Sequence, residues 1–168
     1  MNIFQTAIPG VKIIKPNLYI DRRGSFLETY NSKIYNDLLG AKLRFVQDNY
    51  SISNKSVLRG LHYQKKKPQG KLVYCSHGEI LDVIVDIRED SPTYSKWISW
   101  KLNSDEYNQI WIPPGLAHGF ITLSDSAIFN YKCTAYYDPE DEGSIIWNDS
   151  DLNIDWPAVN PILSEKDM

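Results

Sequence analysis

Two stretches of the 168-residue chain carry side chains that could move protons on a bound molecule. Residues 58–64, LRGLHYQ, place Arg59 and His62 on one predicted strand. Residues 112–120, IPPGLAHGF, place His118 just after a turn formed by Pro-Pro-Gly. Imidazole titrates near neutral pH, so it can accept and return protons. A guanidinium on a strand needs an anion, because burying an unpaired charge is costly. The set indicates proton transfer beside an anion. Taken alone, His62 could equally be a buried structural histidine, and His118 would more often cap its turn.

The second stretch contains the spacing P-x-G-x-x-H, which is similar to the second motif of cupin barrels. Metal-binding cupins add two histidines in H-x-H and a glutamate, because several imidazoles and a carboxylate must converge on one ion. Here Gln64 stands where the second histidine would be, and Lys71 lies near the position of the glutamate. An ammonium group repels a metal cation. We therefore expect no metal site, and a metal-dependent oxygenase or isomerase is the weaker alternative.

The composition of the chain excludes several classes of protein. The formal net charge of −3 creates no field for binding nucleic acid. Cys75 and Cys133 are far apart and form no CxxC pair, so we expect free thiols and a cytoplasmic protein. The N-terminus lacks a signal-peptide pattern, and no apolar run reaches the roughly 18–20 residues that a membrane span needs. The 11 tyrosines and 5 tryptophans suit strands, and they also suit sugars or bases as ligands.

The elements that must position these side chains are mostly short strands. Runs rich in β-branched and aromatic residues alternate with turn residues such as Ser53-Asn54 and His77-Gly78. The predicted strands cover residues 24–30, 45–53, 57–63, 71–76, 79–87, 96–102, 109–112, 119–123 and 127–137. One helix is predicted over residues 33–39, with Asn31 or Ser32 as its N-cap and Gly40 at its end. The pattern predicts one all-β domain over residues 1–168, a sandwich or barrel.

The strand predicted over residues 79–87 carries two aspartates among aliphatic residues. Period two puts residues 81, 83, 85 and 87 on one face, which we expect to pack between the sheets. Asp82 and Asp86 share the other face with two isoleucines. That face could line a cavity, but carboxylates are usually solvated, so an exposed outer surface is the expectation.

Beyond these motifs, the sequence resembles the dTDP-4-dehydrorhamnose 3,5-epimerase family, the sugar-nucleotide epimerases of the rhamnose pathway. The matching text includes DRRG at 21–24, FLE at 26–28, QDNYS at 47–51, LRGLHYQ at 58–64 and QGKLV at 69–73. It continues with GEI at 78–80, DV at 82–83, VDIR at 85–88, SPTY at 91–94, residues 111–120, YKCT at 131–134, YYDP at 136–139, IWND at 146–149 and LSEKD at 163–167. The match runs in order over nearly the whole chain and is specific as a set.

The resemblance implies a cupin-type jelly-roll barrel that uses neither a metal nor a cofactor. The family inverts C3 and C5 of dTDP-4-dehydro-6-deoxy-D-glucose through an enolate and gives dTDP-4-dehydro-L-rhamnose. It also implies a homodimer in which N-terminal strands are exchanged between subunits. An enzyme that inverts C3 alone, and a sugar-nucleotide-binding cupin without activity, are the alternatives.

The resemblance further implies roles for four residues where the sugar reacts. His62 is the base, Lys71 is a cation near the substrate that can stabilise the enolate, and Tyr131 is the acid on the opposite face. Asp167, the penultimate residue, would orient His62. Asp82 is the alternative partner of His62, because it shares the strand face that could line a cavity.

A second set of residues is implied to bind the rest of the substrate. The implied contacts are Arg23 and Arg59 at the phosphates, Gln47 and Asn49 as hydrogen-bond partners, Glu28 at the thymine end, Tyr137 and Tyr19 for stacking, His118 near the sugar, and Glu142 and Lys166 as further contacts. In an exchanged dimer, Arg23 and Glu28 would serve the neighbouring site.

Overall fold

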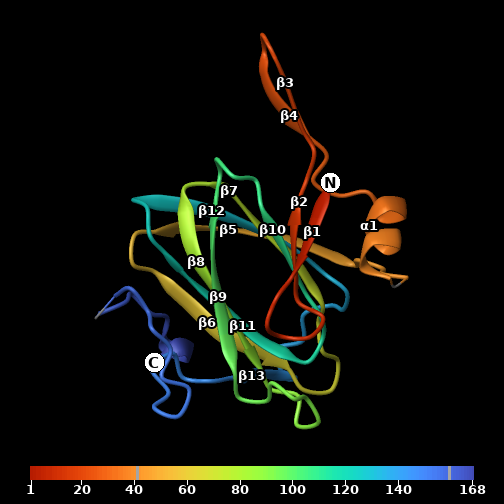
Figure 1. Ribbon diagram of the computed structural model, residues 1–168. Helices are drawn as coiled ribbons and strands as arrows, with labels where there is room; N and C mark the ends of the chain where they lie inside the picture. Colours follow the sequence, from red (N-terminus) through yellow and green to blue (C-terminus); the bar gives the residue numbers. More distant parts are fainter. Residues whose placement is uncertain (41, 159) are drawn as a thin grey trace.

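The computed structural model describes residues 1–40, 42–158 and 160–168, and its main body consists of two antiparallel sheets (Figure 1). The larger sheet has six strands in the order β1-β2-β10-β7-β12-β5. In that order the strands span Asn2–Gln5, Lys12–Lys15, Gln109–Ile112, Lys71–His77, Ser126–Cys133 and Gln47–Asn54.

The second sheet has five strands in the order β13-β6-β11-β8-β9. These strands span Glu142–Ser144, Leu58–Gln64, Leu116–Thr122, Glu79–Asp86 and Trp97–Asn103. From β5 to β12 the chain passes repeatedly from one sheet to the other, which is the topology of a jelly roll. The prediction of an all-β jelly-roll barrel is confirmed.

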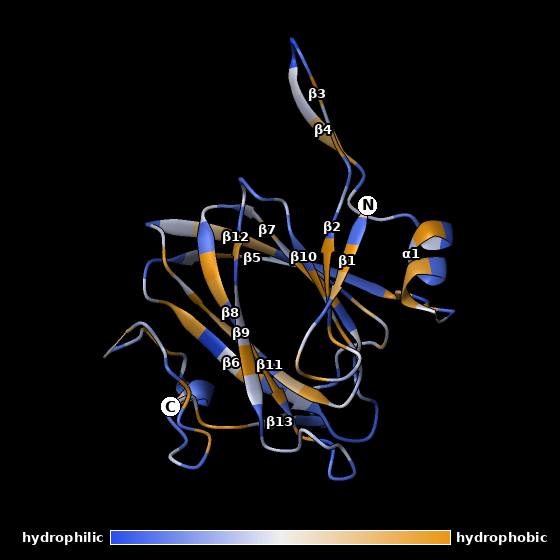
Figure 2. Ribbon diagram, viewed as in Figure 1, coloured by the Kyte–Doolittle hydropathy of each residue, from blue (hydrophilic) through white to orange (hydrophobic). Residues whose placement is uncertain are grey.

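The space between the sheets has an apolar part and a polar part. The apolar part is a cluster of buried side chains from both sheets; it includes Ile13, Val73, Ile84, Leu102 and Phe129. Figure 2 shows β2 and much of β8 coloured as hydrophobic. Removal of these side chains from water drives the two sheets together. The polar part is a cavity lined by side chains of both sheets.

The prediction of which face of β8 packs between the sheets is wrong. Asp82 and Asp86 are fully buried rather than solvated, and Ile84 on their face lies in the cluster between the sheets. Val83, on the opposite face, packs with Trp156 in a second cluster outside the sheet. The C-terminal chain covers this outer face, so both faces of β8 are largely buried. Period two separates the two faces of a strand, but it does not reveal which face a distant segment covers.

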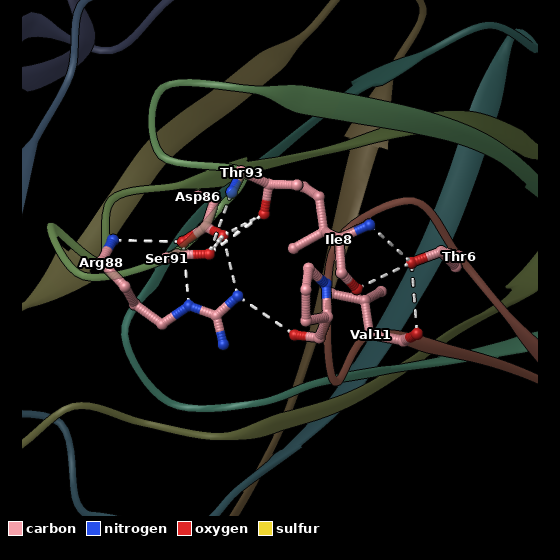
Figure 3. Close-up of polar contacts among 8 residues, drawn as sticks. Thr6, Ile8, Val11, Asp86, Arg88, Ser91 and Thr93 are labelled. Atoms are coloured by element: carbon pink, nitrogen blue, oxygen red, sulfur yellow. Dashed lines mark hydrogen bonds and ion pairs between the residues drawn. The ribbon is translucent and has the colours of Figure 1, made fainter.

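Asp86 ends β8 at the centre of a hydrogen-bonded cluster, drawn in Figure 3. Its carboxylate accepts two bonds of 2.8 Å from the Arg88 guanidinium and one of 2.6 Å from each hydroxyl of Ser91 and Thr93. Arg88 also donates to the carbonyl of Pro9 at 3.0 Å. Burial alone would raise the pKa of Asp86, but these bonds outweigh it and hold the pKa well below its usual value. The cluster fastens the N-terminal turn to the β8–β9 connection.

Helix α1 spans Ser32–Leu39, close to the prediction. Of the two N-caps considered, the structure uses Asn31, whose side chain accepts from the N–H groups of Lys33 and Ile34. Gly40 ends the helix in the left-handed conformation with φ of 67°. The helix buries Tyr35 against the outside of the six-stranded sheet. Within the residues that the structure describes, no helix is long and apolar enough to cross a membrane.

Two further strands, β3 (Leu18–Asp21) and β4 (Gly24–Leu27), form a hairpin that projects away from the barrel (Figure 1). Its side chains Tyr19, Ile20 and Phe26 are 61%, 75% and 69% exposed. The sequence predicted β4 but missed β1, β2 and β3, which have four residues each and lie between Pro9, Pro16 and the turns. Such short runs carry little periodic signal.

Two strand bounds near the cavity differ from the prediction. β11 begins at Leu116 rather than at residue 119, because Leu116 and Ala117 pair with the end of β8. His118 therefore lies inside the strand instead of at its start. β12 ends at Cys133 rather than at residue 137, and the chain that follows turns across one end of the cavity.

Candidate active site

A cavity of about 620 Å³ gathers most of the predicted site residues. Its walls come from both sheets, from β13 and from the 3-10 turn Glu165–Asp167 near the end of the chain. The predicted residues that line it are Gln47, Asn49, Arg59, His62, Lys71, His118, Tyr131, Tyr137, Glu142, Lys166 and Asp167. Four predicted residues do not line it: Asp82, Arg23, Glu28 and Tyr19.

His62, on β6, is hydrogen-bonded to Asp167. Its Nε2 lies 2.6 Å from Asp167 Oδ1, and the Ser164 hydroxyl donates to Asp167 Oδ2 at 2.7 Å. Burial lowers the pKa of His62, as does the charge of Lys166, while Asp167 acts in the opposite direction. A carboxylate on one ring nitrogen orients the imidazole and leaves the other nitrogen free to accept a proton. Of the two partners considered for His62, the structure selects Asp167.

A pair of opposite charges stands beside the imidazole. Glu142 Oε1 lies 3.9 Å from His62 Nδ1, and Lys166 Nζ lies 3.0 Å from Glu142 Oε2. The Tyr137 hydroxyl also donates to Glu142, at 3.2 Å, while the backbone N–H of Tyr137 donates to the side chain of Gln47 at 2.8 Å. Lys166 and Glu142 act on the pKa of His62 in opposite directions.

Asp82 is bonded to His118 and not to His62. His118 Nε2 lies 2.8 Å from Asp82 Oδ2, and both side chains are buried. The alternative in which Asp82 orients His62 is therefore wrong, because β11 lies between β8 and β6 in the sheet. Burial raises the pKa of Asp82, and His118 and Lys71 oppose this change. Asp82 Oδ1 has no hydrogen-bond partner in the described part of the chain.

Lys71 and Tyr131 come from β7 and β12, in the sheet that faces His62 across the cavity. Burial lowers the pKa of the Lys71 ammonium, and Cys133 and Asp82 oppose this change. Burial raises the pKa of the Tyr131 phenol, which therefore stays protonated near neutral pH. A proton acceptor and a proton donor thus lie on opposite walls of one cavity.

One face of β5 supplies hydrogen-bonding groups. Gln47 donates to Asn49 at 2.9 Å, and Arg59 from β6 donates to Ser53 at 3.1 Å. Ser51 also lines the cavity, with a buried hydroxyl that has no partner among the described residues. Ser51 was not among the predicted site residues. The signal was present, since period two places Ser51 on the same strand face as Asn49.

Arg59 and His62 both reach the cavity, although strict alternation puts them on opposite faces of β6. The pairing of β6 with β11 changes register between the residues opposite Arg59 and His62. Within this irregularity Gly60 has φ of 120°, and a Cβ atom there would lie 2.5 Å from Gly119 Cα. Only glycine allows the two backbones to approach so closely.

Within one chain, the structure does not bring Arg23, Glu28 and Tyr19 to the cavity. Arg23 pairs with Asp21 inside the hairpin at 2.5 Å, and Glu28 accepts a bond from Asn31 at 3.3 Å. Tyr19 is largely exposed on β3. Each of these residues lies in the segment from the hairpin to the start of α1.

The position that would carry a metal ligand in other cupins is used for a different purpose. The Gln64 amide donates to the carbonyl of Lys67 at 2.8 Å and accepts from the N–H of Asp138 at 3.0 Å, so it joins two loops. Across residues 1–40, 42–158 and 160–168, no three His, Cys, Asp or Glu side chains converge as metal ligands.

The fold and the cavity together define a class of protein. An oriented imidazole and a protonated phenol face each other inside a jelly-roll barrel, which is the arrangement that an acid–base isomerase of the cupin type requires. A family model described as dTDP-4-dehydrorhamnose 3,5-epimerase matches residues 5–168.

Individual relatives agree with this match. The chain is 52% identical over 169 residues to the dTDP-4-dehydrorhamnose 3,5-epimerase of Salmonella typhimurium, covering 99% of this chain and 92% of that protein. The crystal structure of the dTDP-6-deoxy-D-glucose-3,5-epimerase of Legionella pneumophila, in complex with dTDP-4-keto-L-rhamnose, has a TM-score of 0.96 and 53% identity, over 99% of this chain and 89% of that chain. A 3'-monoepimerase from Streptomyces bikiniensis, in complex with dTDP-quinovose, has a TM-score of 0.91 and 32% identity, over 96% and 83%.

The chain therefore belongs to the dTDP-4-dehydrorhamnose 3,5-epimerase family. It is an isomerase with the cupin fold, which confirms the resemblance and the class of enzyme inferred from the sequence.

Proposed function

We propose that the protein inverts C3 and C5 of dTDP-4-dehydro-6-deoxy-D-glucose and forms dTDP-4-dehydro-L-rhamnose. The observation that carries this proposal is the His62–Asp167 pair on one wall of the cavity with Tyr131 on the other. Inversion removes a proton from one face of a carbon and returns a proton to the opposite face, so it needs two groups. A protein that only binds a sugar nucleotide needs neither.

Proton removal occurs beside the C4 ketone. A C–H group there has a pKa about 12 units above that of imidazole, so unassisted transfer to His62 would cost roughly 16 kcal/mol. The electron pair of the broken C–H bond forms an enolate, and the negative charge collects on the C4 oxygen. Lys71 lies in the same cavity and supplies a positive charge that stabilises this oxygen.

Tyr131 returns a proton from the opposite wall. Its phenol remains protonated near neutral pH because burial raises its pKa. Donation to the enolate carbon restores the ketone and leaves a phenolate, whose charge the nearby Arg59 stabilises. The imidazolium of His62 then loses its proton to water, and the Tyr131 phenolate takes a proton from water. Because the Tyr131 hydroxyl carries solvent hydrogen, solvent hydrogen enters each inverted carbon.

The remaining cavity residues bind the nucleotide and the sugar. The guanidinium of Arg59 suits the oxygens of a phosphate, and Gln47 and Asn49 supply hydrogen bonds. Tyr137 is 48% exposed and presents an aromatic face for the thymine. His118, Glu142 and Lys166 complete this set. The Legionella pneumophila relative, which is 53% identical, was crystallised with dTDP-4-keto-L-rhamnose.

We further propose a homodimer in which the β3–β4 hairpin of each subunit docks on the other. The hairpin projects from its own barrel and exposes Ile20 and Phe26, an apolar surface that would be covered in a dimer (Figure 1). Docking would bring Arg23, Glu28 and Tyr19 to the partner's cavity.

Mixing two inactive variants tests this exchange. Arg23→Ala and His62→Ala chains, unfolded and refolded together in equal amounts, should regain about a quarter of the wild-type activity. About half of the dimers then contain one chain of each kind, and one of the two sites in each mixed dimer has both Arg23 and His62. A monomer by light scattering, or no recovery on mixing, would contradict the exchanged dimer.

The proposed steps use side chains alone, with no metal or cofactor. Activity should therefore survive dialysis against a chelator. Cys75 and Cys133 are free and buried, which fits a reducing cytoplasmic setting.

Incubation with dTDP-4-dehydro-6-deoxy-D-glucose in D₂O tests the proposed reaction. We expect deuterium at both C3 and C5 and formation of the L-sugar. Label at C3 alone would favour the second candidate function, inversion of C3 only. This candidate is considered because the Streptomyces bikiniensis 3'-monoepimerase has the same fold and is 32% identical. No exchange together with retained dTDP binding would indicate a binding protein without activity. Tyr131→Phe should still exchange hydrogen but should not invert.

A further inference from the structure

The connection between β6 and β7 carries three consecutive lysines, Lys65, Lys66 and Lys67, which we call the lysine loop. All three residues are exposed. The residues that flank them, Gln64 and Pro68, both line the cavity. Successive Cα atoms are about 3.8 Å apart, so each lysine Cα lies within about 8 Å of the Cα of a residue that lines the cavity. The lysine loop therefore belongs to the rim of the cavity, and the proposed function gives it no role.

The backbone of the lysine loop is held in place by Asp141. The Asp141 carboxylate is buried and accepts hydrogen bonds from the N–H groups of Lys66 and Lys67, each at 2.8 Å. The N–H of Lys65 donates to the Asp141 carbonyl at 3.1 Å. Burial alone would raise the pKa of Asp141, but the bonds from Lys66 and Lys67 outweigh it and lower that pKa. The carboxylate stays charged near neutral pH, so the loop is fixed while its side chains lie in water.

The ammonium groups of the lysine loop have no partner in the part of the chain that the structure describes. The lysines that do form ion pairs there are Lys55, Lys101, Lys132 and Lys166. Like charges on adjacent residues repel each other, so the lysine loop does not stabilise the free protein through these charges. An anion close to the loop would relieve the repulsion.

The cavity itself offers no excess of positive charge to an incoming anion. Its lining contains three cationic side chains and three carboxylates, namely Arg59, Lys71, Lys166, Glu142, Glu165 and Asp167. Residues 138–141, which are bonded to the lysine loop and to Gln64, add three further carboxylates. Without the lysine loop the mouth of the cavity would be negative, and the whole chain already has a formal net charge of −3. The diphosphate of a sugar nucleotide is a dianion, which such a mouth would repel.

We propose that the lysine loop is an outer anion site that captures the diphosphate of the substrate before it enters the cavity. This inference rests on the proposed function, because it takes a nucleoside diphosphate sugar as the ligand. Ammonium groups on long side chains attract phosphate as point charges, without a fixed geometry. The Debye length is about 10 Å at 0.1 M salt, so charges at the rim act on a ligand at the mouth and are screened at high salt.

An outer site of this kind changes association more than the final complex. Charges at the rim of a binding site mainly set the association rate and its dependence on salt, whereas contacts made in the bound complex set the dissociation rate. In the proposed function the phosphates finally bind to Arg59 inside the cavity. The lysine loop should therefore speed binding at low salt and leave dissociation almost unchanged.

Association of a fluorescent dTDP analogue, followed by stopped flow, tests the lysine loop without any turnover. The variant Lys65→Gln/Lys66→Gln/Lys67→Gln should associate about three- to tenfold more slowly than the wild type at about 20 mM salt, and within about twofold of it at about 0.5 M salt. Its dissociation rate should stay within about twofold. Replacement of all three lysines by arginine retains the charge and should retain the wild-type rate.

The matched control removes the same charge elsewhere on the surface. Lys33→Gln/Lys55→Gln/Lys101→Gln changes three exposed lysines that do not line or flank the cavity. It should associate within about twofold of the wild type at both salt concentrations. Equal slowing in the control would assign the effect to the net charge of the chain and overturn the outer site.

Two further outcomes would overturn the lysine loop as a capture site. One is an association rate equal to that of the wild type at low salt. The other is a loss that persists at high salt or that appears as faster dissociation, since the lysines would then act in the bound complex. Failure of the proposed function is visible separately, because the wild type would then capture the dTDP analogue without incorporating deuterium from D₂O into the sugar.

Discussion

The two imidazole–carboxylate pairs of the cavity make the same bond with different parts of the fold. Asp82 lies within β8 and reaches His118 on the neighbouring strand of the same sheet. Asp167 lies in a short 3-10 turn and meets His62 across 105 positions of sequence. The Asp82–His118 pair forms when the sheet forms, whereas the His62–Asp167 pair also needs the end of the chain to dock.

A few polar contacts tie the segment that carries Asp167. Ser164 donates to the Asp167 carboxylate at 2.7 Å, and Lys166 bonds Glu142 at 3.0 Å. An isolated parallel bridge joins Ile162 to the residue before β6. Segments held by few contacts open at lower free energy than central strands. Activity should therefore be easier to lose at the His62–Asp167 pair than the fold itself.

The largest expected effect is that of replacing His62, the base of the His62–Asp167 pair. His62→Ala should lower formation of the doubly inverted sugar by roughly 10²–10⁴-fold, because no other group takes over its proton transfer. Steady-state kinetics measure this loss, and dTDP affinity within a few-fold of the wild type is the control. Turnover within about tenfold of the wild type would remove His62 from the base role.

Removing residues 165–168 should separate activity from stability. The truncated chain loses Asp167 and Lys166, so turnover should fall by roughly 10²-fold as the imidazole loses its orienting group. The melting temperature should change little, because these residues pack against few others. A large fall in melting temperature, with activity per folded molecule retained, would refute the contrast between the two pairs.

In contrast to removal of residues 165–168, Asp82→Ala should destabilise the fold. The side chain is fully buried, and its removal leaves His118 without its hydrogen-bond partner, at a cost of about 1–3 kcal/mol in the free energy of unfolding. Urea denaturation measures this cost. Asp167→Ala is the matched variant at the chain end, and a larger loss there than in Asp82→Ala would reverse the comparison.

The charges beside His62 allow a finer test by pH. As a base, His62 acts when neutral, so kcat/KM falls as the pH drops through its pKa. Lys166 lowers that pKa and Glu142 raises it. Lys166→Gln should therefore move the acidic limb of the profile to higher pH, and Glu142→Gln should move it to lower pH, each by about one unit or less. Shifts in the same direction would show that the two charges do not act on His62 in this way.

The smallest effect is expected at Ser164. Ser164→Ala removes one hydrogen bond to the Asp167 carboxylate, worth about 1 kcal/mol, while leaving the bond between His62 and Asp167 in place. Turnover should fall by about fivefold, and Ser164→Thr should restore most of it. No effect of Ser164→Ala would show that the turn holds Asp167 without this bond.

Local patterns in the sequence were sufficient for most of the secondary structure. Short runs of β-branched and aromatic residues marked the central strands, and Asn31 and Gly40 marked the ends of α1. These signals depend on neighbours a few residues apart, so no knowledge of the fold was needed. The short N-terminal strands carried too little of this signal and were missed.

Side-chain placement depended on pairings that local patterns do not encode. Alternation separated Arg59 from His62, but the register change between β6 and β11 brings both to the cavity. Alternation also grouped Asp82 with Asp86, but a distant segment decided that both faces of β8 are buried. Within one chain, Arg23 pairs with Asp21 in the hairpin and does not reach the cavity.

By itself, the sequence determined the all-β class and, through its motifs, the family and the residues available for acid–base chemistry. Only the tertiary structure decided which carboxylate serves which imidazole. Asp82 and Asp167 were both candidates for His62, and the order β6-β11-β8 puts His118 within reach of Asp82 while the docked chain end puts Asp167 beside His62. The physical reason is that a hydrogen bond acts over about 3 Å, and residues far apart in sequence come that close only when the whole sheet and its covering segments have formed.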